Sequence, residues 1–91
     1  MFTVIWRAAA LDAVSDLYVT LNLDGQNRLA SAIDSLNHRL AADPLDVGES
    51  REGSYRVAFP DVLVVSFWVD TPAALVQVVS AARFSRQRPG G

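Results

Sequence analysis

The spacing of the apolar residues changes twice along this chain, and this change constrains the fold more than any other feature. Within residues 2–7, which are rich in β-branched and aromatic residues, Phe2, Val4 and Trp6 alternate with Thr3, Ile5 and Arg7, as in a β-strand. Within residues 11–40, apolar side chains recur at steps of three and four, which indicates amphipathic helices. The alternating period returns in residues 55–82. The predicted order is therefore one strand, a helical region and a set of strands.

The helical region is predicted to contain two helices joined by a short turn. The apolar stripe of the first helix consists of Leu11, Val14, Leu17, Tyr18 and Leu21. Residues 22–26 form the turn, and Asp24 is the predicted N-cap of the second helix. The apolar stripe of the second helix consists of Leu29, Ile33, Leu36 and Leu40. Pro44 ends this helix, because proline disfavours the helical conformation of the residue before it.

The second half of the chain reads as strands. Residues 45–54 contain Gly48 and Gly53 and are predicted to form a loop. Three strands follow, at residues 55–59, 62–69 and 75–82. The connections between them are short, so neighbouring strands should be antiparallel.

These elements predict an α+β fold of the order β-α-α-β-β-β. The helical hairpin should pack on one face of a mainly antiparallel four-stranded sheet. The chain has 91 residues, which is room for one domain. We expect this domain to cover residues 1–86, with a flexible polar tail at residues 87–91.

Both faces of the strand at residues 62–69 are apolar. One face consists of Leu63, Val65, Phe67 and Val69, and we assign it to the core. The other face consists of Val62, Val64, Ser66 and Trp68. A contiguous apolar patch on a small protein usually marks an interface, so this face is predicted to bind a partner or a second copy of the chain. The alternative is a hydrophobic central strand over which the tail folds.

Composition excludes several classes of function. The chain contains no cysteine, which removes disulfides and thiolate metal sites. His38 is the only histidine and lies off the apolar stripe, so no metal site and no cofactor are expected. All basic residues are arginines, and the net charge of −2 speaks against broad nucleic-acid binding. No segment has the length of a membrane span or the pattern of a signal peptide, so a cytoplasmic location without membrane contact is predicted.

Several short stretches resemble the RelE/ParE superfamily of bacterial toxins. Residues 4–14 resemble the family's opening strand and first helix, and residues 28–45 resemble its second helix and the turn after it. Residues 51–57, Arg-Glu-Gly-Ser-Tyr-Arg-Val, resemble the basic segment that leads into the second strand. The last two strands are similar as well, so that the likeness covers residues 2–86.

This resemblance implies a cognate antitoxin as partner, and either mRNA cleavage on the ribosome or inhibition of DNA gyrase. In the RNA-cleaving branch, basic residues on the open sheet face stabilise charge on the phosphate. Arg56 and Arg83 match such positions and are the candidate catalytic residues. Leu63 stands where the family often has arginine, and Phe84 follows Arg83 in place of an acid or base. These departures weaken the prediction of RNA cleavage more than that of gyrase inhibition.

The predicted site is a cluster on the open face of the sheet. Besides the two arginines, its candidate binding residues are Arg51, Ser66, Trp68 and Gln77. Trp68 is the expected partner anchor. Tyr55 is placed opposite Arg56 by strand parity and is assigned to the core or an edge. Two functions stay open: a toxin held inactive by its antitoxin, and an inactive relative that serves as an interaction or dimerisation domain.

Overall fold

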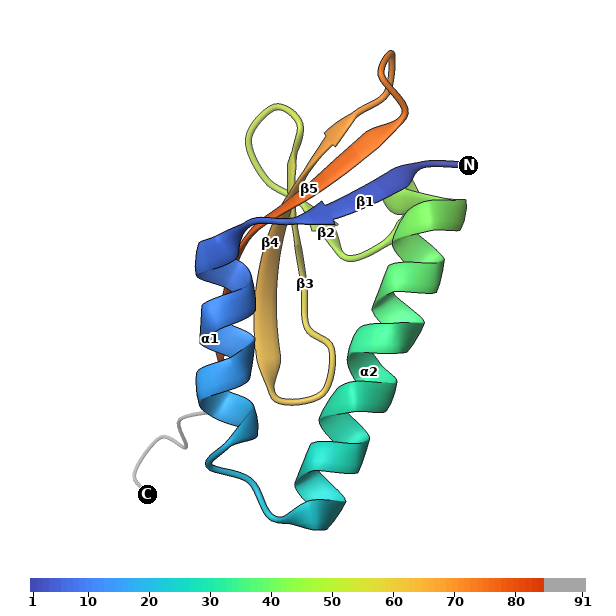
Figure 1. The fold of residues 1–91 in the computed structure, drawn as a ribbon. Coiled ribbons are helices and arrows are strands. Elements are labelled where there is room, and N and C mark those ends of the chain that lie inside the picture. Colours follow the sequence, from blue (N-terminus) through green and yellow to red (C-terminus); the bar gives the residue numbers. More distant parts are fainter. Residues whose placement is uncertain (85–91) are drawn as a thin grey trace, which may run out of the picture.

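A computed structural model describes residues 1–84 of the chain. The elements follow one another as a strand, two helices and four further strands (Figure 1). Their bounds are β1 Thr3–Trp6, α1 Ala8–Tyr18, α2 Leu23–Ala42, the 3-10 helix η1 Pro44–Asp46, β2 Glu49–Ser50, β3 Tyr55–Ala58, β4 Leu63–Asp70 and β5 Leu75–Arg83. The predicted α+β class and element order are confirmed, apart from the additional short elements between α2 and β3.

The sheet has five strands in the order β1-β5-β4-β3-β2, so the predicted number of four is wrong. β1 runs parallel to β5, and the other pairs are antiparallel. The additional strand β2 lies in the segment predicted as a loop and has only two residues. It forms because Gly53, with φ of 58°, lets the chain turn back onto β3. The Arg51 N–H then donates to the Tyr55 carbonyl at 2.9 Å.

The ends of α2 are set by local contacts. The N-cap is Asn22, not the predicted Asp24: its side-chain oxygen accepts from the Gly25 N–H at 2.9 Å. At the other end, α2 stops at Ala42 and Asp43 has φ of −155°, as expected for a residue before Pro44. The predicted end of this helix is confirmed.

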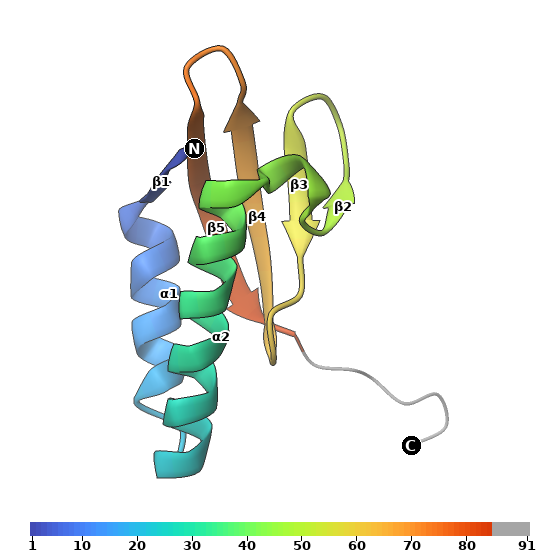
Figure 2. The ribbon, with the colours of Figure 1, turned by 90° about the vertical axis from the view of Figure 1, so that its right-hand side faces the viewer.

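α2 lies across one face of the sheet, while α1 runs beside β5, beyond the end of β1 (Figures 1 and 2). The buried residues of α1 are Ala10 and Leu17, whereas Leu11 and Tyr18 are exposed. The predicted apolar stripe of this helix is therefore only partly correct. A small alanine at the contact lets the helix approach the strand closely, and the larger leucine beside it faces solvent.

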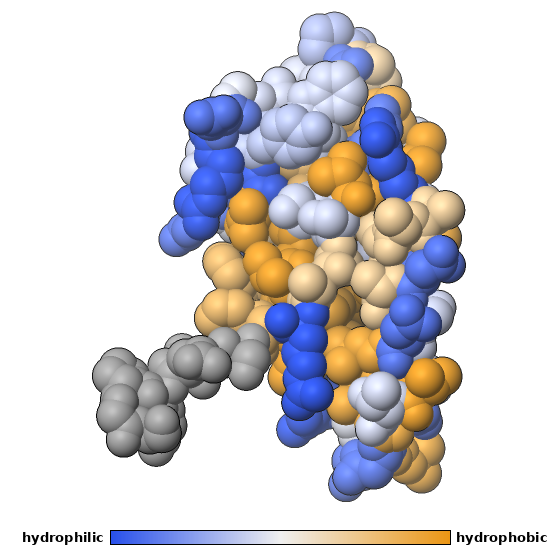
Figure 3. Space-filling model, turned by 90° about the vertical axis from the view of Figure 1, so that its left-hand side faces the viewer, coloured by the Kyte–Doolittle hydropathy of each residue, from blue (hydrophilic) through white to orange (hydrophobic). Residues whose placement is uncertain are grey.

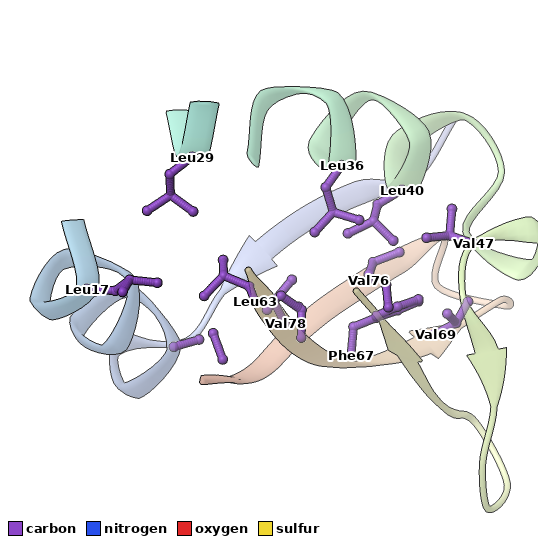
Figure 4. Close-up of a cluster of buried hydrophobic side chains, with 14 residues drawn as sticks. Leu17, Leu29, Leu36, Leu40, Val47, Leu63, Phe67, Val69, Val76 and Val78 are labelled. Atoms are coloured by element: carbon purple, nitrogen blue, oxygen red, sulfur yellow. The ribbon is translucent and has the colours of Figure 1, made fainter. Parts of the chain in front are cut away.

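The core lies between the two helices and the strands, and α2 supplies most of its helical residues (Figure 4). Three residues of the predicted α2 stripe, Leu29, Leu36 and Leu40, are buried, and the fourth packs partly buried against them. The β4 residues assigned to the core are confirmed, and the exposed fraction of Phe67 is 0%. We call the side of the sheet that carries Phe67 the covered face and the other side the open face.

A β-bulge interrupts the pairing of β4 with β5. Ser66 pairs with Ser80 but Phe67 pairs with Val78, so Val79 is an extra residue in β5. Before the bulge Val76 and Val78 face the core, and after it Ala81 does. Because the buried positions change parity at the bulge, the sequence of β5 shows no regular alternation of apolar and polar residues. Part of the predicted domain and the whole predicted tail fall in residues 85–91, outside the described residues.

Candidate functional site

A row of side chains crosses the open face from one edge of the sheet to the other. The register pairs Ile5 with Gln77, Gln77 with Trp68, and Trp68 with Tyr55. Paired residues of neighbouring strands point to the same side, so these side chains share the open face. Trp68 and Gln77 were predicted to lie together, and the structure places them side by side.

Tyr55 was assigned to the core or an edge, and this assignment is wrong. Its side chain lies on the open face beside Trp68, with an exposed fraction of 47%. The exposed Tyr55 and the half-buried Trp68 together offer a rigid apolar surface with a phenol and an indole donor. Such pairs are common anchors of protein interfaces.

Arg7 and Gln77 form the polar end of this row. The Arg7 Nε and one terminal nitrogen both donate to the Gln77 Oε1, at 3.1 and 3.0 Å. The contact holds the amide oxygen of Gln77 on Arg7, and the amide N–H groups take no part in it. Arg7 was not among the predicted site residues, although its alternation with Trp6 in the first strand indicates this face.

Arg51 lies at the opposite end of the row. Its N–H bond to Tyr55 continues the β2–β3 register, which places its side chain on the open face. The guanidinium pairs with the Glu49 carboxylate at 3.2 Å, and both side chains are exposed. The predicted binding residue Arg51 is thus at the rim of the open face, but its charge is balanced by a neighbour.

Smaller side chains occupy the next row of the open face. The predicted residue Ser66 pairs with Val57 on one side and with Ser80 on the other. Beyond this row, Phe59 and Phe84 stack edge to face, with ring centroids 5.2 Å apart. The side of the molecule turned away from α2 shows apolar side chains across its middle and hydrophilic ones around them (Figure 3).

Arg56 is not on the open face, so the prediction that it lies with Trp68 is wrong. Arg56 pairs with Phe67, whose side chain is in the core, and therefore points to the covered face. Its Nε donates to the Val47 carbonyl at 2.9 Å and its terminal nitrogen to the Gly48 carbonyl at 3.1 Å. These bonds tie β3 to the segment after α2.

Arg83 is also displaced from the predicted cluster. Because of the bulge at Val79, Arg83 pairs with Leu63 and shares its side of the sheet. Counting alternate residues forward from Gln77 placed Arg83 on the open face, and the extra residue Val79 reverses that result. The two candidate catalytic arginines are therefore separated from Ser66, Trp68 and Gln77.

A surface groove of about 360 Å³ lies on the other side of the molecule, between α2 and the turn after β3. Arg39 is its only charged lining residue. The groove shares no residue with the two open-face rows, but Phe59, which stacks on Phe84 beyond them, is among its lining residues. Within residues 1–84, no three His, Cys, Asp or Glu side chains are grouped as a metal site would require. In the same part of the chain, none of the helices combines the length and apolar character needed to cross a membrane.

The chemistry of the open face is that of a binding surface. Cleavage of an RNA phosphodiester requires cations placed around the phosphate to stabilise the charge of the transition state. It also requires groups that donate and accept protons. The described residues of the open face supply arginines only at its two ends, each engaged by Gln77 or Glu49. Its centre supplies apolar and aromatic area with hydroxyl and amide groups, which suits recognition of another macromolecule.

Fold and site together define a small α+β protein with a mixed five-stranded sheet and one sheet face left bare by its helices. Solved structures with this fold include the toxin–antitoxin complex RelBE2 from Mycobacterium tuberculosis, at a TM-score of 0.70 and 18% identity over 93% of each chain. The chromosomal ParDE toxin–antitoxin system from P. aeruginosa matches at 0.63 and 15% identity, over 93% of this chain and 98% of that chain. The isolated E. coli RelE toxin matches at 0.62 and 13% identity, over 96% and 88%.

The chain therefore has the RelE/ParE toxin fold, as the resemblance in its sequence predicted. No protein-family model matches the sequence, and no curated protein matches it either. At identities this low, the likeness establishes the fold, and function has to be argued from the open face.

Proposed function

We propose that this protein is the toxin-like component of a bacterial type II toxin–antitoxin module and acts by binding its target through the open face. The fold it shares with RelE and ParE proteins supports the toxin-like role. The exposed aromatic residues of the open face support binding as the mode of action. Inhibition of DNA gyrase is the target class that fits this mode, because it needs no phosphate-cleaving constellation.

One observation carries the proposal: the two candidate catalytic arginines lie on the other side of the sheet from the open-face row. Arg56 donates to two backbone carbonyls, and Arg83 shares the side of Leu63. Ribosome-dependent mRNA cleavage would need them beside Ser66 and Trp68. Their separation favours target binding over RNA cleavage.

The proposed partner is an antitoxin whose segment covers the same face. The neighbouring structures RelBE2 and ParDE are toxin–antitoxin assemblies, which supports a partner of this kind. Trp68 and Tyr55 would be its anchors, and the amide N–H groups of Gln77 would donate to a carbonyl or carboxylate oxygen of the antitoxin. An antitoxin on this face would block target binding by direct competition. The cytoplasmic location expected from the sequence stays a prediction.

A second function is supported by the same face. Its centre has no free cation among the described residues, so a relative that has lost toxicity and retains binding would have the same surface. This alternative is an interaction or dimerisation domain without effect on growth.

The test is growth of a bacterial host after tightly controlled induction. Three forms are compared: the parent, Trp68→Thr on the open face, and the double variant Arg56→Gln/Arg83→Gln. Threonine keeps the strand propensity while removing the indole. We expect arrest with the parent and the arginine variant, and normal growth with Trp68→Thr.

Two other outcomes of the growth assay would contradict this proposal. If the arginine variant grows normally while Trp68→Thr still arrests the host, the active residues are those on the other side and target binding by the open face is refuted. If the parent does not slow growth although it accumulates as soluble folded protein, the toxin proposal is abandoned in favour of the interaction domain. Circular dichroism and soluble yield of all three forms keep folding defects apart from loss of activity.

A further inference from the structure

The two edges of the sheet differ in how they are protected against pairing with another strand. The β2 edge has two residues and carries the Arg51–Glu49 ion pair. β1 has four residues, Thr-Val-Ile-Trp, with no charge, proline or glycine. Natural proteins usually protect edge strands by shortness, charge or proline, and β1 has only uncharged residues of high strand propensity.

The free hydrogen-bonding groups of β1 belong to two residues. The Thr3 N–H donates to the carbonyl of Ala74, just before β5, at 2.8 Å, and the Arg7 N–H donates to the Val78 carbonyl of β5 at 2.9 Å. The odd-numbered residues of this strand therefore hydrogen-bond toward β5. The N–H and C=O groups of Val4 and Trp6 point away from β5, and within residues 1–84 these N–H groups have no hydrogen-bond acceptor. At Phe2 the edge is closed by α2, whose Ala41 carbonyl accepts the Phe2 N–H at 2.8 Å. No helix or strand lies in front of β1 where its edge faces the viewer (Figure 1).

We propose that this edge pairs with the β1 edge of a second copy of the chain. In an antiparallel pairing that places Val4 opposite Trp6 of the second copy, every free N–H and C=O group of both edges is bonded. The twofold axis then passes beside Ile5, whose side chain meets Ile5 of the second copy on the open-face side. Ile5 is 47% exposed in the single chain, and this contact covers it. The two sheets become one continuous sheet.

Self-complementarity is the reason to choose a second copy as the occupant. The unpaired backbone groups belong to Val4 and Trp6, which are spaced symmetrically about Ile5. The edge of one copy can therefore hydrogen-bond to the same edge of a second copy, with no further requirement on the sequence. Because α2 closes the edge at Phe2, the paired segment is short and the buried area small. The dimer should therefore be weak and concentration-dependent. Pairing in the plane of the sheet leaves Trp68 and Tyr55 uncovered, so the dimer does not depend on the proposed toxin function.

Cysteine crosslinking of the full chain tests this register, since the natural sequence has no cysteine. In the proposed dimer Ile5 faces itself in a non-hydrogen-bonded pair, with Cα atoms about 4.5 Å apart, which allows a disulfide. Thr3→Cys is the matched control: it lies on the same side of the same strand, but its two copies would be roughly 13 Å apart. We expect Ile5→Cys to give a covalent dimer under mild oxidation and Thr3→Cys to remain monomeric.

Light scattering after size exclusion gives the second readout. The parent should shift from monomer to dimer as its concentration rises to the millimolar range. Ile5→Lys should stay monomeric throughout, because it sets like charges directly opposite each other. A parent that is monomeric at all concentrations overturns the proposal. A dimer that Thr3→Cys crosslinks as well as Ile5→Cys, or that Ile5→Lys leaves intact, overturns it too, because the contact is then elsewhere.

Discussion

The two faces of this sheet are built from the same strands and are nearly equally apolar, yet only one of them is covered. Phe67 and Trp68 are adjacent residues of β4: the first is fully buried beneath α2, and the second faces outward on the open face. On the covered face, apolar side chains provide the core that holds the helices to the sheet (Figure 4). On the open face, they have no such partner within the described chain and are available for binding.

The polar contacts of the two faces also differ in what they connect. Arg56, on the covered side, reaches two backbone carbonyls and joins two segments of the fold. Arg7, on the open side, reaches one amide oxygen of Gln77 and stays exposed. Contacts on the covered side therefore connect elements of the fold, whereas contacts on the open side arrange the surface.

The largest expected effect comes from truncating Phe67 and Trp68, the two adjacent residues of β4, one at a time. Phe67→Ala removes a fully buried ring and should lower the free energy of unfolding by about 3–5 kcal/mol. That is a large part of the stability of a domain of this size. Trp68→Ala removes a larger side chain that is only partly buried, and its loss should be about 1–2 kcal/mol. Urea denaturation followed by circular dichroism measures both.

Equal losses would show that the open face is packed as tightly as the covered one, and the contrast would fail. Trp68→Ala should also leave the slope of the denaturation curve unchanged, because the core stays intact. If Phe67→Ala is too unstable to purify, Leu40→Ala, also fully buried, replaces it with an expected loss of about 2–5 kcal/mol.

The covered face could be predicted from the sequence because long periodic patterns determine it. Alternation along β4 identified its buried residues, and the three-four spacing in α2 identified the stripe above them. β2 could not be predicted in this way. A two-residue strand has no period, and it forms only because Gly53 turns the chain back onto β3.

The candidate site was predicted only in part, because strand register is not visible in a single sequence. Ser66, Trp68 and Gln77 do share a face, whereas the bulge at Val79 moves Arg83 to the other side. Arg56 was misplaced because β3 is short and its parity relative to β4 was unknown. Whether any of these residues contacts a target stays a prediction for the growth assay.

A second test compares two glycines with positive φ, one beside β3 on the covered side and one in the β2–β3 turn. Gly48 has φ of 65°, and an added Cβ would collide with the Val57 backbone carbonyl. Gly48→Ala combines left-handed strain with overpacking and should cost roughly 2–5 kcal/mol. Gly53 has φ of 58° with nothing within 4 Å of an added Cβ, so Gly53→Ala should cost only about 1–2 kcal/mol. Thermal unfolding ranks the two, and a larger loss at Gly53 would contradict the close approach at Gly48.

The last and smallest effect concerns Arg56 and Arg7, each of which donates two hydrogen bonds through its guanidinium. Arg56→Gln removes charge-assisted bonds to the Val47 and Gly48 carbonyls and should cost about 1.5–3 kcal/mol. Arg7→Gln removes two bonds to an exposed amide and should change stability by no more than about 0.5 kcal/mol. The matched chemistry of the two substitutions isolates the side of the sheet as the variable, and urea midpoints measure it. A loss at Arg7 as large as that at Arg56 would mean that the open face also holds the fold together, and its role as a free binding surface would have to be given up.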